Sequence, residues 1–307
     1  MNRGGYEAAT ILLKRLEAME FFVEQFITGL SIGSILLIVA LGLSVIYGSM
    51  GVINMAHGEF IMLGAYAAWA LNTFFGITLF PSLILIFAGL ALLGAIIERL
   101  VIQHLYRRPI DTILATWGIG VMLQQLVRLT AGGELRYAEM PPSLADTVFV
   151  LGVEVSAYRL FIILAGAVLF GGTWFLINKT TVGMKLRAVV QDRSIATAFG
   201  INADRIYTGT FAYGAGLAGL AGALVAPLKS VSPEMGTGYV VDAFFVVVLG
   251  GVQSLLGTVA SSFLLGQASG ILAFWQNDTI AKALVLIAIV MLIRFRPQGL
   301  FVTRVRT

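Results

Sequence analysis

The sequence predicts an all-α integral membrane protein with about eight to ten transmembrane segments. Of its 307 residues, 58% are hydrophobic and 12% are charged, whereas an average soluble domain has about 25% charged residues. The apolar residues occur in long runs that match the roughly 20 residues a helix needs to cross the hydrocarbon core. The chain therefore has room for these helices and short loops, but not for an additional soluble catalytic domain.

Nine apolar segments, separated by turn-rich or charged stretches, mark the expected helices. They cover 21–50, 58–75, 80–104, 112–130, 158–178, 206–228, 239–250, 256–275 and 280–295. All seven prolines fall at or near segment ends, where a missing backbone N–H costs least. Residues 1–20 mix basic and acidic side chains, so we expect an amphipathic lead-in on the membrane surface. Residues 21–307 are expected to form a single transmembrane domain.

Basic residues indicate which loops face the cytoplasm. Eleven of the 20 Lys and Arg residues lie in the 105–111 loop, the 179–205 loop and the tail from 294, and cytoplasmic loops carry such an excess. The 131–157 loop holds one Arg and four acidic residues and is expected to face outward. An inward tail then requires an odd number of crossings after 229–238, so one segment within 239–295 must be short, broken or re-entrant.

Several classes of function are excluded by what the sequence lacks. It has no cysteine, and its two histidines lie 47 residues apart, so no metal or haem cluster is expected. There is no nucleophile elbow, no H-E-x-x-H pair and no P-loop. The few charges are also too sparse for a nucleic-acid partner. Any energy for transport would therefore come from a partner or an ion gradient.

Two glycine-bounded breaks interrupt the apolar runs, one in each half of the chain. The first reads GVINMAHG over 51–58 and the second reads GGVQSLLG over 250–257. Such pairs are typical of transporter sites built from discontinuous helices in an inverted-repeat arrangement, although glycine also permits close helix packing. The glycines expected to mark the breaks are Gly51, Gly58, Gly250, Gly251 and Gly257.

Polar side chains in and near the breaks are candidates for lining or supporting a solute path. They are Asn54, His57, Glu59, Asp242, Gln253 and Ser254. A carboxylate at the bilayer centre costs at least about 2.5 kcal/mol, so Glu59 is expected in a cavity, near a boundary or beside His57. The alternative for this cluster is a structural network that holds the break together. Asp242 either guards the outer mouth or ends in the headgroup layer.

The 179–205 loop contains a second element with a functional signature. Residues 183–201 are compatible with one short helix that carries a broken apolar stripe and ends at Gly200, a suitable C-terminal cap. The helix is too short to span a membrane. It therefore lies on the membrane surface or docks in a groove of a partner.

Three stretches resemble a known family. Gly42 to Tyr66, Arg187 to Ile201 and Val248 to Val252 are similar to the inner-membrane permeases of ABC importers for branched-chain amino acids and urea. The urea permease B branch looks closer over 114–119, 178–180, 241–251 and 296–301. The 140–143 and 190–193 stretches depart from the urea pattern.

The resemblance implies a set of partners. These are a second homologous permease subunit, two ABC ATPase subunits, a periplasmic substrate-binding protein and the lipid membrane. ATP and Mg²⁺ would be bound by the ATPases, and no cofactor by this chain. The 183–201 helix would then be a cytoplasmic coupling helix that contacts an ATPase through Lys185, Arg187, Gln191 and Arg193.

The predicted function is therefore that of a permease subunit forming half of a path across the bacterial inner membrane. A small neutral solute, urea first, suits a path of amide, hydroxyl and carboxylate groups. The alternative substrate is a branched-chain amino acid or short amide, which requires partners for an ammonium and a carboxylate. A passive urea channel, a secondary carrier and an intramembrane enzyme acting through His57 and Glu59 are the remaining hypotheses.

Overall fold

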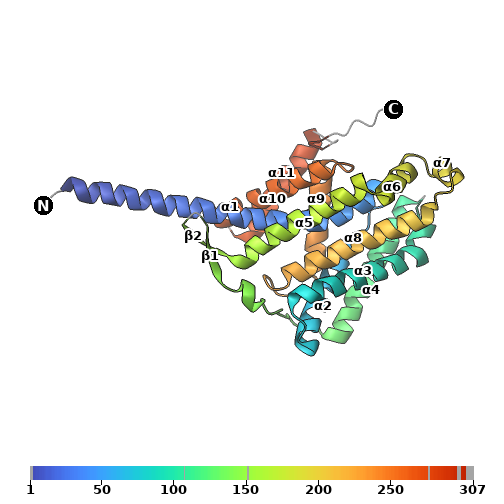
Figure 1. The fold of residues 1–307 in the computed structure, drawn as a ribbon, viewed down its shortest axis with the longest axis horizontal. Helices are drawn as coiled ribbons and strands as arrows, with labels where there is room; N and C mark the ends of the chain where they lie inside the picture. Colours follow the sequence, from blue (N-terminus) through green and yellow to red (C-terminus); the bar gives the residue numbers. More distant parts are fainter. Residues whose placement is uncertain (1–2, 107, 151, 276, 296–298, 302–307) are drawn as a thin grey trace.

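The computed structural model describes residues 3–106, 108–150, 152–275, 277–295 and 299–301, and for 3–20 and 278 it describes the backbone alone. Helices dominate this part of the chain (Figure 1). They are α1 (Arg3–Met50), α2 (His57–Phe75), α3 (Leu79–Leu100), α4 (Pro109–Ala131), α5 (Ala157–Lys179), α6 (Thr181–Gln191), α7 (Arg193–Ala198), α8 (Ala203–Val225), α9 (Met235–Gly250), α10 (Leu255–Trp275) and α11 (Asp278–Phe295). Two short 3₁₀ turns, η1 (Ile102–His104) and η2 (Pro142–Leu144), complete the helical elements.

The apolar segments of the sequence correspond to these helices. Six of the described helices are long and apolar enough to cross a membrane, and α9 is apolar but only 16 residues long. The helices α2 and α11, of 19 and 18 residues, pack in the same bundle. The prediction of an all-α integral membrane fold is therefore confirmed. The predicted surface lead-in at 1–20 stays a prediction, although α1 runs unbroken from Arg3.

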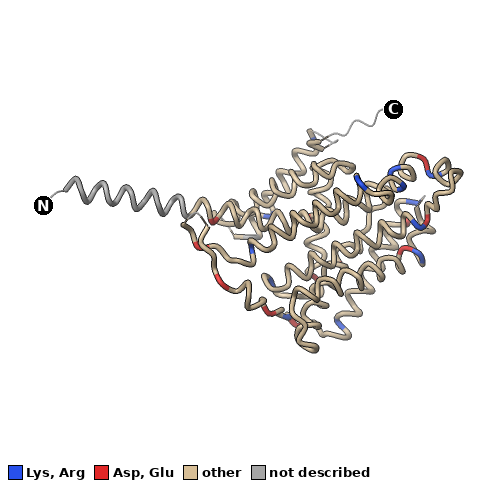
Figure 2. Tube along the Cα trace, in the orientation of Figure 1, with Lys and Arg blue, Asp and Glu red and all other residues tan. Residues whose placement is uncertain are grey.

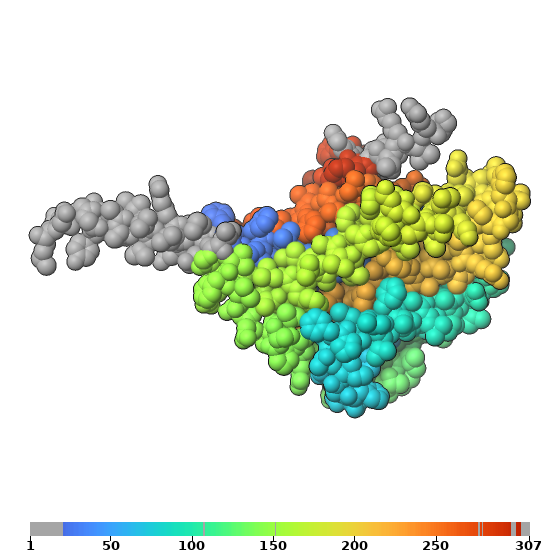
Figure 3. All heavy atoms as spheres, viewed as in Figure 1, coloured from blue at the N-terminus to red at the C-terminus, as the bar shows by residue number. Residues whose placement is uncertain are grey.

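Helices α1 and α8 form the buried centre of the bundle. In each, 83% of the most apolar window is buried. Helix α1 packs against α5, α8, α9 and α10, while α8 packs against α2 and α3. Small residues allow this closeness: a Cβ added at Gly222 of α8 would lie 1.8 Å from the Ile61 carbonyl oxygen of α2. Figure 3 shows α5, α8 and α3 as successive diagonal bands on one face.

The two ends of the bundle differ in charge (Figure 2). We call the end that carries α6 and α7 the basic end, because the Lys and Arg residues of the 179–205 loop gather there. The opposite, acidic end carries the outer loop with β1 (Thr147–Val150) and β2 (Val153–Ser156), an antiparallel hairpin. The excess of basic residues predicts that the basic end faces the cytoplasm. Of the predicted cytoplasmic residues, Arg107, Arg296, Arg304 and Arg306 lie outside the described residues.

The described residues between 235 and 295 form three helices, α9, α10 and α11, and three crossings would give the odd number that the charge pattern requires. The short member is α9, which ends at Gly250. Helices α1 and α9 run in the same direction, because Ile35 lies with Asp242 around one cavity and Gly48 lies beside Val252. An inverted repeat about an axis in the membrane plane would relate antiparallel helices. The expected inverted arrangement therefore does not extend to α1 and α9, and both breaks begin at the basic ends of these helices.

Candidate functional site

The first break carries an irregular backbone into the interior of the bundle. Helix α1 ends at Met50, Gly51 adopts a left-handed φ of 65°, and α2 begins only at His57. Between them, Val52 and Asn54 are buried. Non-helical backbone at membrane depth requires partners for its polar groups, and these come from within the break and from α1 and α4.

Three hydrogen bonds that involve side chains hold this break. The Asn54 Oδ1 accepts from the Ala56 N–H at 3.1 Å, and the Met55 N–H donates to Thr116 Oγ1 of α4 at 3.1 Å. The fully buried His57 ring lies with Nε2 3.1 Å from the Val39 carbonyl oxygen of α1. A carbonyl oxygen can only accept, so His57 Nε2 carries a proton. His57 and the carboxamide oxygen of Asn54 therefore belong to a hydrogen-bond network that holds the break together, which was the alternative to a solute path.

The same cluster retains unused hydrogen-bonding capacity. Among the described residues, Asn54 Nδ2, His57 Nδ1 and Glu59 Oε2 are buried and have no hydrogen-bond partner. Buried polar atoms almost always have one. These three atoms are therefore the part of the first break that is chemically suited to contact a polar solute.

The second break is a tight turn. Gly251 adopts a φ of 96°, and the Ser254 Oγ accepts from the Gly257 N–H at 3.0 Å. The backbones of Gly250 and Gly257 approach so closely that a Cβ at Gly257 would lie 1.9 Å from the Gly250 carbonyl oxygen. Gln253 is exposed at the tip. Ser254 thus caps the N-terminus of α10. Glycine is required at positions 250 and 257 because α9 and α10 touch there.

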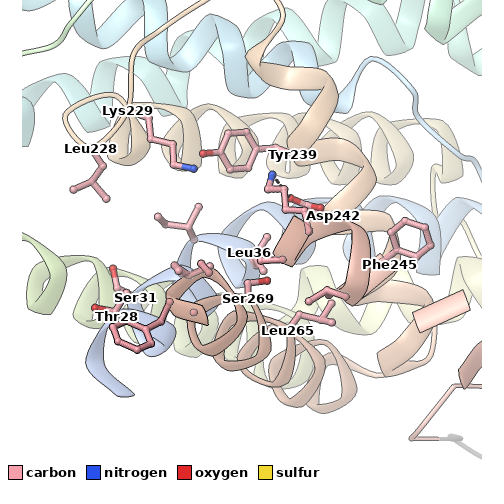
Figure 4. Close-up of a pocket in the computed structure, with 18 of the residues that line it drawn as sticks. Thr28, Ser31, Leu36, Leu228, Lys229, Tyr239, Asp242, Phe245, Leu265 and Ser269 are labelled. Carbon is pink, nitrogen blue, oxygen red and sulfur yellow. Dashed lines mark hydrogen bonds and ion pairs between the residues drawn. The ribbon is translucent and has the colours of Figure 1, made fainter. Parts of the chain in front are cut away.

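The six candidate path residues therefore fall into three groups. Asn54, His57 and Glu59 lie at the first break, while Gln253 and Ser254 lie at the second. Asp242 is on α9 toward the acidic end, with its Oδ2 3.3 Å from the Nζ of Lys282 on α11. This pair lines a cavity of about 420 Å³ (Figure 4).

Sequence reasoning missed the partners of Asp242. Lys282 stands within the apolar 280–295 segment, and an ionisable residue in such a segment is itself a signal of a functional site. Lys229 and Tyr239, which line the same cavity, lie near a turn and within an apolar run and carry no such signal. Among the described residues, no group of three or more metal-ligating side chains could hold an ion.

The predicted coupling helix over 183–201 is two helices. Helix α6 is capped by Thr180, whose Oγ1 accepts from the Gly183 N–H at 3.3 Å. It ends at Gln191, and Asp192 starts α7 by accepting from the backbone N–H groups of Ser194 and Ile195 at 2.8 and 2.9 Å. Gly200 closes α7 with a φ of 83°. The apolar stripe continues across the junction, so periodicity alone concealed the second cap.

Helices α6 and α7 present an exposed surface at the basic end (Figure 3). Its basic and polar side chains are the predicted Lys185, Arg187, Gln191 and Arg193, all exposed. Its large apolar side chains include Phe199 and Met184, exposed by 83% and 62%. Apolar groups of this size on a short amphipathic element outside the membrane-spanning helices suit a protein or membrane contact.

The fold and the two breaks define a polytopic membrane transport protein with discontinuous helices. The model of the family described as "Branched-chain amino acid transport system / permease component" matches residues 25–294. The chain is 28% identical over 301 residues to the high-affinity branched-chain amino acid transport system permease protein BraD of Pseudomonas aeruginosa, covering 91% of this chain and 95% of BraD. It is 28% identical over 300 residues to LivH of Escherichia coli, with 90% and 95% coverage. No solved structure matches the chain.

The chain therefore belongs to the branched-chain amino acid transport system permease family. A relative in the archaeon Methanocaldococcus jannaschii, a probable branched-chain amino acid transport permease protein LivH, is 24% identical over 288 residues, or 87% of this chain and 88% of that protein. The chain is thus a multi-pass inner-membrane permease subunit of the ABC importer class, and not an enzyme. Membership in this class implies ATPase and substrate-binding partners and a second permease.

Proposed function

We propose that the chain forms half of the translocation path of an ABC importer for branched-chain amino acids. The observation that carries this substrate is the end-to-end similarity to BraD and LivH, whose names state branched-chain amino acid transport. Urea is the first substrate that the sequence pattern suggests, but the similarity to these relatives supports the alternative, a branched-chain amino acid, better. Urea, and more remotely a passive urea channel, are therefore the competing hypotheses.

In this proposal, the first break contributes to the path through Asn54, His57 and Glu59. Their three buried atoms without partners supply both donor and acceptor capacity to a passing solute. Asp242 lines the outer cavity, and Gln253 and Ser254 form the turn at the cytoplasmic side. The glycines of the two breaks allow the helices to approach one another closely at these points.

The surface of α6 and α7 provides the link to energy. ATP and Mg²⁺ are bound by two ATPase subunits, one of which docks on this surface, and a periplasmic binding protein delivers the solute at the acidic end. Exposed apolar residues flanked by arginines suit a groove on a partner helix bundle. A second homologous permease forms the other half of the path.

The experiment is reconstitution of the complete importer in proteoliposomes, with uptake of labelled leucine and labelled urea measured in parallel. We expect ATP-dependent leucine uptake that unlabelled isoleucine and valine inhibit and excess urea does not. ATP-dependent uptake of urea alone would replace the proposed substrate. Solute flux through this chain without ATPases or ATP would instead establish a channel or carrier.

A further inference from the structure

The cavity beside Asp242 is a feature that the two breaks do not explain. It lies between α1, α9, α10 and α11 and has a volume of about 420 Å³, within the roughly 300–1,000 Å³ of small-molecule sites. It lies toward the acidic end, the side from which an importer receives its solute. Its position fits an outer binding site rather than the cytoplasmic turn.

One wall of the cavity is charged. The Asp242 carboxylate contacts the Lys282 ammonium at 3.3 Å, and their side chains remain 33% and 57% exposed. Lys229 and the Tyr239 hydroxyl lie on the same side (Figure 4). The Asp242 carboxylate, two ammonium groups and the Arg159 guanidinium, which donates to Thr28 Oγ1, therefore line one small space, and a ligand can still reach the ion pair.

The opposite wall is apolar. Leu36 and Leu265 lie below Asp242 in Figure 4, whereas Phe245 is on α9, one turn after Asp242. Val285 and Ile289 of α11 also line the cavity. A ligand that filled the cavity would place its polar groups on one side and an aliphatic or aromatic part on the other. Ser31 and Ser269 add neutral hydroxyls on the side of Leu36 and Leu265 (Figure 4).

We infer that this cavity binds a zwitterionic α-amino acid with an aliphatic side chain, its ammonium on Asp242 and its carboxylate on Lys282, with Lys229 as a second cation. The inference rests on the proposed function and names where that substrate first contacts this chain. The apolar wall receives the side chain. The cavity is thus a recognition site within the permease itself.

The charge balance favours a zwitterion over a neutral solute. When an α-amino acid enters between Asp242 and Lys282, each charge exchanges one ionic partner for another. Urea or another neutral amide would separate the same two charges and return no charge to either, which is costly in a partly desolvated site. A fatty acid or lipid phosphate would meet the lysines but would leave Asp242 facing a like charge.

The test is binding of labelled L-leucine to the full-length chain in detergent micelles, competed by two analogues. 4-Methylpentanoate is leucine without its ammonium, and 3-methylbutylamine is leucine without its carboxylate. We expect Asp242→Asn to weaken leucine binding at least about tenfold and to leave 4-methylpentanoate unweakened. Lys282→Gln should weaken leucine similarly and leave 3-methylbutylamine unweakened. Asp111→Asn, which removes the carboxylate of an exposed ion pair with Arg108 at the basic end, is the matched control and should change none of the three.

A cavity-filling variant keeps the test independent of the ion pair. Ser269→Phe leaves both charges in place and should abolish leucine binding, while the thermal unfolding of each variant reports whether it folds. Leucine binding that survives Asp242→Asn and Ser269→Phe in folded protein overturns the site, as does equal binding of leucine and either analogue. If the reconstituted importer still takes up leucine in that case, the proposed function stands and the site alone fails. If the chain binds leucine in this charge-specific way but the reconstituted importer transports only urea, the site stands and the proposed function fails.

Discussion

The hydroxyl of Tyr106 donates a hydrogen bond to the carboxylate of Glu98, which is fully buried at the basic end of α3. The other carboxylate oxygen of Glu98 accepts from Thr208 Oγ1 of α8 at 2.6 Å. The Tyr106 ring also lies 5.9 Å from the guanidinium carbon of Arg193. The same carbon lies 5.6 Å from the Tyr207 ring. The chain of contacts therefore connects α7, which begins at Arg193, to two membrane helices.

Replacing Tyr106 by Phe should destabilise the protein by about 1–3 kcal/mol, because it leaves one buried oxygen of Glu98 without its donor. Burial and the adjacent Glu98 raise the pKa of the Tyr106 hydroxyl, so it remains a donor at all working pH values. Chemical unfolding in detergent measures the effect. Tyr137→Phe, at a ring that is 69% exposed, is the control and should lie within about 0.5 kcal/mol of the parent. Equal stability of the two variants would contradict the role of Tyr106.

Gly58→Ala should separate α2 from α9. A Cβ at Gly58 would lie 2.3 Å from the Gly236 carbonyl oxygen, and backbone cannot move aside as a flexible side chain can. We expect a loss of about 1–3 kcal/mol or more and a lower melting temperature. Gly118→Ala on α4, where a Cβ would meet nothing within 4 Å, should be neutral or slightly stabilising. A melting temperature unaffected by Gly58→Ala would show that α2 and α9 do not pack in this way.

Thr116→Val tests how the first break is held. The valine keeps the shape of the side chain but cannot accept from the Met55 N–H, so we expect a loss of about 1–3 kcal/mol. Thr130→Val on the same helix removes a hydroxyl that bonds only within α4, to Leu126 and Val127, and should cost less than about 0.5 kcal/mol. Amide exchange of residues 52–56 should accelerate in the first variant only.

The helices could be predicted because their cause is local. A run of about 20 apolar residues must become a helix in lipid, since no other single segment satisfies its own backbone. The first break could be predicted for the same reason: glycine at 51 and polar residues at 54 and 57 cannot continue the run without consequence. The structure adds which partner each group finds.

Contacts between distant segments could not be predicted from the pattern. Asp242 and Lys282 are 40 residues apart, and only the packing of α9 against α11 brings them together. The direction of α9 relative to α1 likewise depends on tertiary packing, so two similar glycine patterns did not reveal that both breaks begin at the same end of the bundle. The split at Asp192 was missed because a side-chain cap restarts a helix without interrupting its apolar stripe.

The role of Asp192 as the N-cap of α7 predicts how the stability of α7 depends on pH. Hydrogen bonds from the Ile195 N–H and the Ser194 side chain lower the pKa of Asp192 below its ordinary value of 3.8. A carboxyl group whose pKa is lowered in the folded state contributes its full stabilisation above its ordinary pKa. This stabilisation is lost as the pH falls through the lowered pKa. Protection of the α7 amides, corrected for intrinsic exchange, should therefore be constant between about pH 5 and 8. Asp192→Ala should remove this protection and Asp192→Asn should retain it, because asparagine is also a good N-cap. Protection that declines between pH 8 and 6 would contradict the assignment.

Reversal of charge at Arg193 should uncouple ATP hydrolysis from uptake. Arg193 Nη2 donates to Asp204 Oδ1 at 2.5 Å, so Arg193→Glu places two carboxylates together and removes the cation from the faces of Tyr106 and Tyr207. Helix α7 then loses its cation–π contacts with Tyr106 and Tyr207, while the membrane helices keep their own contacts. Arg187→Glu should act in the same direction on α6, because the Arg187 guanidinium donates to the Ile177 carbonyl oxygen at the end of α5. We expect normal insertion, continued ATPase activity and loss of most substrate uptake in the reconstituted importer.

Arg128→Glu reverses an exposed arginine that pairs with Glu234 near the acidic end and should leave the ratio of uptake to hydrolysis unchanged. Full uptake with both Arg187 and Arg193 reversed would mean that α6 and α7 merely lie on the membrane.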